Sequence, residues 1–190
     1  QRFQEKMLPV MFAGTKYANC FPIGTMDVVM NFKPQTLRDY YEKWYRPDLQ
    51  GVIVVGDIDV DADEAQIKKM FADIPAQPNG AKREYYPVND NKEPIVLVAR
   101  DKEQPYVQTF IFNKHEATPR EEKNNVGYLM QDYAVTLITN MLNARLNELL
   151  QAANPPYIYA ATYDDDFFVA KTKDAFTGIV VCKEDAIENG

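Results

Sequence analysis

The sequence predicts an α+β fold, a two-layer sandwich in which one mostly antiparallel sheet is covered by helices on one face. Two observations predict it. Short β-branched or aromatic runs are typical of strands, and longer segments repeat apolar residues every three or four positions, as helices do. These segments come in unequal runs, which is the pattern of an α+β sandwich. With 190 residues, 46% of them hydrophobic, the chain has enough apolar material for a single domain with a real core.

The N-terminal part predicts two helices and a strand. Residues 2–8 have a helical pattern, and a second helix follows near 37–45, with Pro34 in its first turn and Pro47 preventing continuation. Its bulky residues share one face, which we expect to be core: Leu37, Tyr40, Tyr41, Trp44 and Tyr45. Residues 52–55 are β-branched throughout and predict a strand buried on both faces, closed by Gly56 and Asp57.

The remaining elements follow in order. Asp61 or Asp63 can cap a helix that ends near Phe71, and a surface linker rich in proline and asparagine spans 75–94. We then expect a hairpin of strands 95–99 and 106–112, and a helical stripe within 119–151 that breaks near Asn143. Strands are predicted at 157–163, 167–173 and 175–182, and residues 183–190 could begin another helix.

Composition excludes several functions. A net charge of -7 and a pI of about 4.8 leave no basic footprint for nucleic acid. No apolar run approaches the length of a membrane span, and the sequence contains no signal peptide. Cys20 and Cys182 lack CxxC spacing, so buried free thiols are expected, although a disulfide stays open.

Two acidic runs and the single histidine could be interpreted as metal-binding sites, but we favour structural roles for all three. The acidic run 57–64 resembles the start of a calcium loop, but Ala62 and Lys68 stand where an EF-hand needs glycine and glutamate. A strand end followed by a helix N-cap is preferred. The aspartates 164–166 predict a solvated turn rather than a cation site. His115 is interpreted as an exposed loop residue rather than a ligand.

The order Tyr-Arg-Pro-Asp at 45–48, apolar strand and Gly56-Asp57 resembles the insulinase/pitrilysin zinc metallopeptidases, inverted zincins related to the mitochondrial processing peptidases. The resembling part is the domain that follows their zinc-binding segment. Further segments agree with it in order and separation: 14–17 with 21–25, 71–75 and 141–149. The resemblance covers nearly the whole chain and implies the processing-peptidase-like metallohydrolase fold.

The zinc site of that family is expected to lie outside this chain. It needs His-x-x-Glu-His and a more distant glutamate, whereas this chain has one histidine, His115. We therefore expect no catalytic residue and no bound metal here, with Zn as the cofactor of the full-length parent. The first residue is Gln1 and the helix at 2–8 has no capping residue before it, so residues 1–190 are expected to be a single-domain fragment of a longer peptidase.

The resemblance implies one pair of substrate-binding residues, Arg145 and Tyr157. In the two-half peptidases of the family, an arginine and a tyrosine from the equivalent region of the second half reach the zinc site and hold the substrate. The residues 154–156, Asn-Pro-Pro, depart from the shorter glycine-containing approach to the tyrosine in the family. The alternative is structural, with Arg145 pairing near a helix end and Tyr157 packing with its hydroxyl satisfied.

The predicted function is that of a non-zinc-binding C-terminal part of one half of a zinc metalloendopeptidase. Such a part would support a clamshell and its substrate chamber, with a peptide substrate and a second homologous half or subunit as partners. The parent would be active and this fragment alone inactive. The alternatives are a non-catalytic scaffold or partner subunit of the same family, and a stand-alone peptide- or protein-binding module. Family habit suggests the bacterial periplasm or cell envelope.

Overall fold

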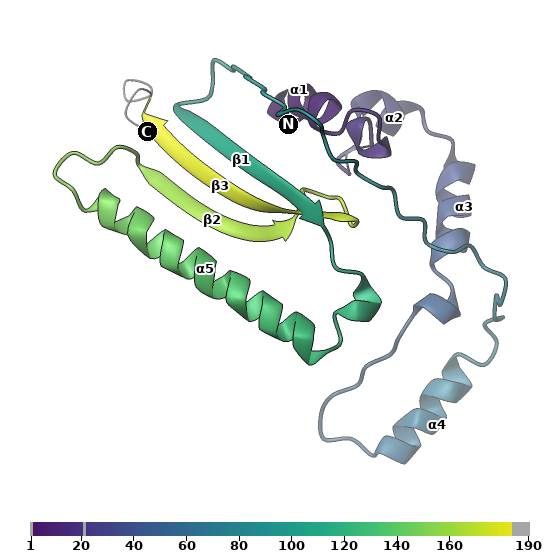
Figure 1. Ribbon diagram of the computed structural model, residues 1–190. Coiled ribbons are helices and arrows are strands. Elements are labelled where there is room, and N and C mark those ends of the chain that lie inside the picture. The colour runs from purple at the N-terminus through teal and green to yellow at the C-terminus, as the bar shows by residue number, and fades with distance from the viewer. Residues whose placement is uncertain (1, 21, 184–190) are drawn as a thin grey trace. The chain divides into compact units, whose positions relative to one another are not determined.

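The structure is a computed structural model that describes residues 2–20 and 22–183. These residues form five α-helices, three short 3-10 helices and one three-stranded sheet (Figure 1). The helix predicted from residue 183 onward falls outside the described residues. The chain divides into two compact units: residues 1–22 with 85–190, called the sheet unit, and residues 23–84, called the helical unit.

The sheet unit is built on three antiparallel strands, β1 (Tyr106–Glu116), β2 (Tyr159–Asp166) and β3 (Lys173–Lys183), in the order β1-β3-β2. The central strand β3 pairs with all 11 residues of β1 and all 8 residues of β2. Three of the predicted strands are thereby confirmed, as is the α+β class with an antiparallel sheet. Backbone hydrogen bonding on both sides makes β3 the structural centre of the unit.

The strand predicted at 167–173 is wrong, because residues 167–172 form the turn that joins β2 to β3. The turn is closed by hydrogen bonds from the Phe167 amide to the Lys173 carbonyl at 2.9 Å and from the Ala170 amide to the Phe167 carbonyl at 3.1 Å. Phe168 has a φ of 57°, in the left-handed region that strands do not use. The apolar character that suggested a strand serves burial instead, since Phe167 and Ala170 are core residues.

The helix α5 (Val126–Leu150) covers one face of the sheet along β2, as Figure 1 shows. It begins at the N-cap Asn125, whose side chain accepts a hydrogen bond from the Tyr128 amide at 2.9 Å. The predicted break near Asn143 is wrong. The Asn143 side-chain amide instead bonds the backbone of Thr162 in β2, accepting from its N–H at 2.7 Å and donating to its carbonyl at 2.9 Å. A polar residue here joins helix to sheet without bending the helix.

The opposite face of the sheet is covered at one end by α1 (Arg2–Met11) and the residues that follow it. The core there contains Leu8 and Phe12 from the α1 segment with Phe167, Ala170 and Ala175. Ala175 alternates with the β3 residues that face α5, so this core lies on the other side of the sheet. The helix predicted at 2–8 is confirmed.

The predicted hairpin of 95–99 with 106–112 is wrong, because residues 95–99 form no strand. Val96 and Val98 are strongly exposed, and the inner edge of β1 is fully used by β3. The predicted turn between them does form, and Arg2 of α1 binds Asp101 in it at 2.7 Å. This hydrogen bond and ion pair lower the pKa of Asp101 to about 2 and hold the turn against α1.

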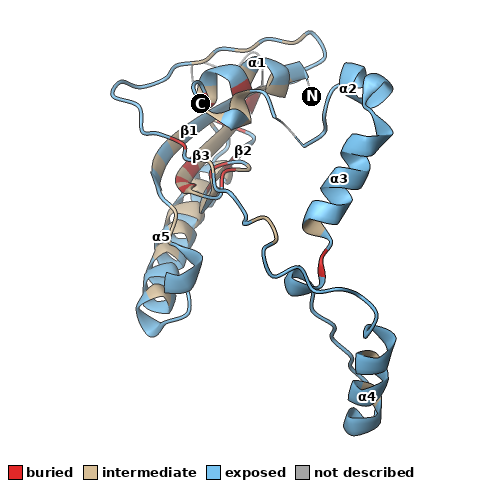
Figure 2. Cartoon of the chain, turned by 90° about the vertical axis from the view of Figure 1, so that its right-hand side faces the viewer, coloured by how far each residue is buried: buried red, intermediate tan, exposed pale blue. Residues whose placement is uncertain are grey.

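The helical unit contains α2 (Met26–Asn31), α3 (Pro34–Trp44) and α4 (Val60–Met70). The helix predicted at 37–45 is confirmed as α3, with Pro34 in its first turn. Its apolar face is not core within the described structure: Leu37, Tyr40, Tyr41 and Tyr45 are all more than half exposed. Figure 2 shows α3 and α4 as exposed over most of their length.

The strand predicted at 52–55 is also wrong in this structure. These residues form no strand ladder, and Ile53 and Val55 are 88% and 91% exposed. A strand needs a neighbour to bond its backbone, and the three strands of the described sheet all belong to the other unit. The next helix, α4, is confirmed, but its cap is Asp59 rather than Asp61 or Asp63, since Asp59 accepts from the Ala62 amide at 3.1 Å.

Candidate functional site

The two residues predicted to bind substrate differ in their surroundings. Tyr157 is buried, packs against Ala160 and Cys182, and donates a hydrogen bond from its hydroxyl to the Leu146 carbonyl of α5 at 2.6 Å. Burial raises the pKa of Tyr157, so the hydroxyl stays protonated at neutral pH. Arg145, the residue before Leu146, has an exposed side chain. The hydroxyl that would contact substrate is therefore engaged in holding α5 to the start of β2, and a substrate role for the pair stays a prediction.

The residues present do not fit the zinc site of the inverted zincins. That site needs two imidazoles one helical turn apart. His115 is the single histidine of the sequence and lies on a strand. Within residues 2–20 and 22–183, no group of three or more histidine, cysteine, aspartate or glutamate side chains could hold a metal ion. That the chain binds no zinc stays a prediction for metal analysis.

His115 is exposed, as its sequence neighbours predict, but it does not lie in a loop. It lies on β1, about half exposed, and its Nε2 is 2.8 Å from Asp164 Oδ1 on β2. Burial lowers the pKa of His115, but the hydrogen bond and charge of Asp164 outweigh that effect and raise it. The aspartates 164–166 are the last residues of β2, not the predicted solvated turn. Nothing in the sequence indicates this pair, because its members are 49 positions apart in the chain.

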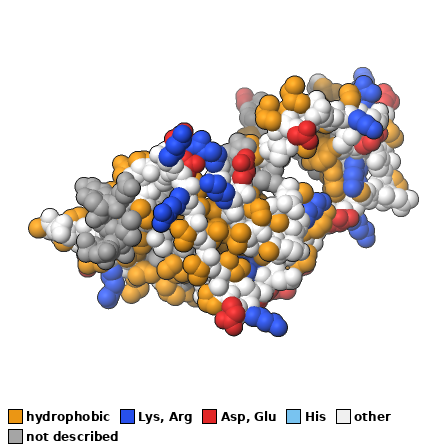
Figure 3. All heavy atoms as spheres, turned by 90° about the horizontal axis from the view of Figure 1, so that it is seen from above, with side chains coloured by type: hydrophobic (Ala, Val, Ile, Leu, Met, Phe, Trp, Pro, Cys, Tyr) orange, Lys and Arg blue, Asp and Glu red, His pale blue; other side chains and the backbone are white. Residues whose placement is uncertain are grey.

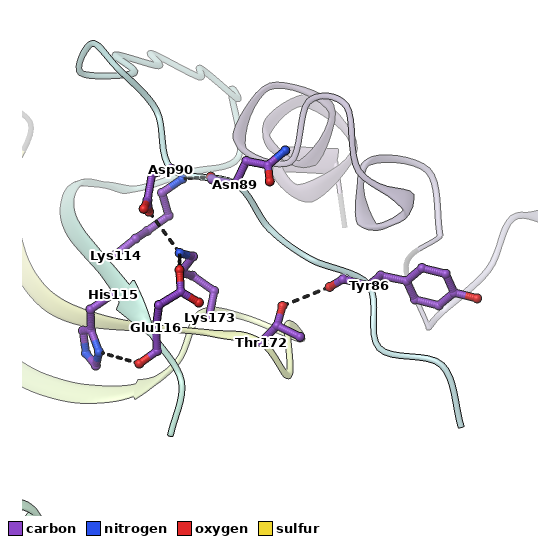
Figure 4. A network of polar contacts seen from close by, with 8 residues as sticks. All are labelled: Tyr86, Asn89, Asp90, Lys114, His115, Glu116, Thr172 and Lys173. Carbon is purple, nitrogen blue, oxygen red and sulfur yellow. Dashed lines mark hydrogen bonds and ion pairs between the residues drawn. The ribbon is translucent and has the colours of Figure 1, made fainter. Parts of the chain in front are cut away.

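Lys173, at the start of β3, is the most deeply buried charged side chain described and the centre of the polar network in Figure 4. Its Nζ lies 3.0 Å from Asp90 Oδ1 and also bonds Glu116 of β1. Burial lowers the pKa of Lys173, but the two carboxylates outweigh it and raise the pKa, so the ammonium is kept. The network therefore joins β1 and β3 to a segment of the predicted linker.

That segment, residues 86–90, is called the docked segment. Two further hydrogen bonds hold it, from Thr172 Oγ1 to the Tyr86 carbonyl at 3.0 Å and from Lys114 Nζ to the Asn89 carbonyl at 2.9 Å (Figure 4). Val88 is buried in the core with Leu8 and Phe12. Most of the predicted surface linker at 75–94 is exposed and irregular, but the docked segment is part of the sheet unit.

The two cysteines do not pair with each other. Cys182 is buried on β3, as predicted for a free thiol, whereas Cys20 is exposed, which contradicts its expected burial. The acidic run 57–64 contains the start of α4, with Asp59 as its cap, which confirms the helix N-cap expected there, whereas the strand end expected before it does not form. No described helix is long and apolar enough to cross a membrane.

Residues 31–167 match the family described as the peptidase M16 inactive domain, and the chain belongs to that family. The match covers most of the chain and includes the Tyr-Arg-Pro segment, β1 and α5. The resemblance to the insulinase/pitrilysin zinc metallopeptidases is thereby confirmed. The part of those proteins that matches this chain is the inactive domain.

Particular relatives agree with this assignment. The chain is 27% identical to the probable zinc protease PqqL of Escherichia coli over 161 residues, which are 85% of this chain and 17% of that protein. It is 28% identical to the probable zinc protease PqqL of Haemophilus influenzae over 151 residues, 77% of this chain and 16% of that protein. The chain thus spans less than a fifth of the length of these relatives.

A solved structure confirms the fold. The first half of the periplasmic protease PqqL from E. coli superposes with a TM-score of 0.79 at 23% identity, over 99% of this chain and 39% of that one. Because the identity is low, this likeness is informative about the fold alone. The fold of the chain is that of part of the first half of that E. coli protein.

Proposed function

We propose that this chain is a non-catalytic, non-zinc-binding part of one half of a zinc metalloendopeptidase that degrades or processes peptides. The observation that carries the proposal is the match of residues 31–167 to the peptidase M16 inactive domain. A single histidine agrees with it, because the metal that activates water must then be held by residues other than these. The contribution of this chain would be to support the clamshell and the wall of its substrate chamber.

The exposed apolar surfaces support a role inside a larger assembly. Large hydrophobic side chains of α5 are more than half exposed, among them Leu129, Met130, Tyr133, Ile138 and Met141. Hydrophobic side chains, orange in Figure 3, are widespread on the face shown there. Extensive exposed apolar surface is a mark of interaction sites on proteins. We assign these surfaces to contacts with the second homologous half or subunit, which favours an assembly over a stand-alone binding module.

For substrate binding, Arg145 is the better candidate of the predicted pair. Its guanidinium is exposed and can bind a peptide carbonyl or carboxylate in a bidentate manner. Tyr157 could reach a substrate only by giving up its 2.6 Å hydrogen bond to Leu146. We therefore propose a packing role for Tyr157 and keep Arg145 as the substrate contact to be tested in the active parent.

Metal analysis and a peptidase assay on the 190-residue chain test the proposal. We expect less than stoichiometric zinc after dialysis and no cleavage of unfolded peptides that a chelator suppresses. Chelator-sensitive cleavage by this chain would contradict it. The coding sequence next to this segment then separates the two roles within the family, because an intact His-x-x-Glu-His favours the peptidase and its loss favours the scaffold subunit.

The proposed location is the bacterial periplasm or cell envelope. The support is the solved relative from E. coli, whose description names it a periplasmic protease. Fractionation of cells that express the full-length protein is expected to recover it outside the cytoplasm, and recovery with the cytoplasmic markers would contradict this.

A further inference from the structure

His115 is placed so that its ring spans the width of the sheet. In the strand register it lies opposite Asp174 of the central strand β3, and Asp174 lies opposite Asp166 of β2. The ring reaches over β3 to Asp164, so that the pair connects β1 directly with β2. Its other ring nitrogen, Nδ1, is 3.2 Å from the Glu116 carbonyl. Both ring nitrogens thus face an oxygen.

Two oxygen acceptors select the doubly protonated ring. A neutral imidazole has one N–H, so one of its two nitrogens would present a lone pair to an oxygen. The imidazolium donates from both nitrogens and satisfies the Asp164 carboxylate and the Glu116 carbonyl together. The geometry alone therefore favours the charged ring, and the raised pKa of His115, in which Asp164 and Asp174 both take part, agrees with it.

The other charged groups around the ring favour the same state. Three carboxylates, Asp164, Asp166 and Asp174, gather on this face of the sheet, and Asp166 is paired with Lys171. Asp174 Oδ1 is buried without a hydrogen-bond partner among the described atoms. Burial raises the pKa of Asp174, opposed by the charge of Lys123, and Asp166 adds to the rise. Loss of the proton from His115 would leave this acidic group with less opposing charge.

We propose that His115 and Asp164 form a pH-dependent latch that ties the two outer strands of the sheet together across β3. The latch closes in mildly acidic solution and opens as the ring loses its proton. It lies at the end of the sheet where Lys173 holds the docked segment and where β1 leads toward α5. Mild acid therefore stabilises this end of the sheet. The latch does not depend on the proposed peptidase role.

The direction of the pH effect follows from the raised pKa. Below the pKa of a histidine in the unfolded chain, the ring is charged in both states and the latch contributes fully to stability. As the pH rises through the higher pKa of the folded state, the proton is lost and so is the contribution. Asp174, whose pKa is also raised, acts in the same sense, because its ionisation as the pH rises is unfavourable in the folded chain.

NMR titration of the 190-residue chain tests the latch, since its single histidine gives one set of imidazole signals. We expect the His115 pKa above the ordinary value of about 6.5 and a clear decrease in Asp164→Asn. The matched control is Asp165→Asn, which removes the same charge one residue away on the opposite face of the sheet and should leave the titration unchanged. A pKa at or below the ordinary value, or one that Asp164→Asn does not change, would overturn the latch.

A second measurement keeps the test independent of that variant. Urea unfolding at pH 6 and pH 8.5 is expected to show that the wild type is more stable than His115→Gln at the lower pH and loses that advantage at the higher one. Should Asp164→Asn fail to fold, the nitrogen shifts of the wild-type ring decide, because the latch requires both nitrogens to keep their N–H until the pH exceeds the ordinary histidine pKa of about 6.5. A stability difference that is the same at both pH values would also overturn it.

Discussion

At the scale of single residues, Lys173 is the side chain whose environment departs most from its residue type. Lysine is almost never fully buried unless it is paired, and the side chain of Lys173 is only 2% exposed. Its partners Asp90 and Glu116 are mainly exposed, so the ammonium is shielded from water while both carboxylates remain solvated. Removing the carboxylates should therefore cost more stability than removing the lysine, because it would leave a buried ammonium uncompensated, whereas water can solvate the carboxylates.

We predict opposite costs for removing the two sides of this network. Lys173→Met keeps the apolar stem in place and releases carboxylates that water can solvate, so the free energy of unfolding should change by less than about 1 kcal/mol. The double variant Asp90→Asn with Glu116→Gln leaves the ammonium buried and poorly compensated, which should cost about 3 kcal/mol. Urea unfolding followed by circular dichroism measures both. A lysine variant that is the more destabilised of the two would contradict this reasoning.

Arg46 of the Tyr-Arg-Pro-Asp motif is a second buried charge with a structural role. It is 4% exposed, and its guanidinium binds both carboxylate oxygens of Asp48 at 3.0 Å and the Lys43 carbonyl at 3.3 Å. The motif therefore closes the end of α3 onto the following turn.

At the scale of elements, the clearest contrast is between predicted strands that pair with a neighbouring strand and predicted strands that do not. Residues 106–116 and 173–183 pair along their whole length and are ordered as strands. Residues 52–55 and 95–99 have equally strong β composition but form no strand ladder and are mostly exposed. Composition expresses how well a side chain fits a sheet, and the sheet itself has to supply the neighbouring backbone.

The central strand offers an element-scale prediction at Gly178. This glycine lies inside β3 between Ile111 and Thr162, and a Cβ added to it would meet no atom within 4 Å. Gly178→Ala should raise the free energy of unfolding by about 0.4–1 kcal/mol, because it reduces the freedom of the unfolded chain without a clash. Chemical unfolding measures the change, and a loss of stability would mean that the space beside β3 is filled.

Gly14→Ala is the matched control for that substitution. A Cβ at Gly14 also meets nothing within 4 Å, but its φ of 77° lies in the left-handed region. The same change should therefore destabilise the chain, by roughly 1 kcal/mol, through backbone strain alone. A gain in the free energy of unfolding for Gly178→Ala together with a loss for Gly14→Ala would separate the effect of backbone strain from that of packing.

At the scale of the whole molecule, the chain consists of two units with different burial. Most of the buried residues belong to the sheet unit, while the helical unit has Arg46 as its one buried residue among those described. A unit with so little buried apolar surface has little to offset its conformational entropy. The single domain predicted for residues 1–190 is thus a question for unfolding experiments.

The single tryptophan makes that question measurable. Trp44 lies at the end of α3 in the helical unit, whereas the 25-residue α5 belongs to the sheet unit and contributes strongly to circular dichroism. We predict that the Trp44 fluorescence transition in urea occurs at a lower concentration than the far-ultraviolet transition. Coincident transitions would instead support one cooperative domain.

Sequence by itself determined the main helices and the family. The ring spacing between Pro34 and Pro47 specified α3, the apolar stripe specified a helix within 119–151 but not its continuity, and the Tyr-Arg-Pro-Asp order pointed to the peptidase family. These inferences succeed because helix periodicity and proline act over a few residues.

Only the tertiary structure decided which strands pair and which charges meet. Strand β1 pairs with β3, at residues 173–183, rather than with residues 95–99, which are nearer in the sequence. His115 of β1 contacts Asp164 of β2 across the central strand β3. Lys173 forms an ion pair with Asp90, which lies 83 positions earlier in the sequence. Such contacts depend on strand order and register, which a side chain's own neighbours in the sequence do not encode.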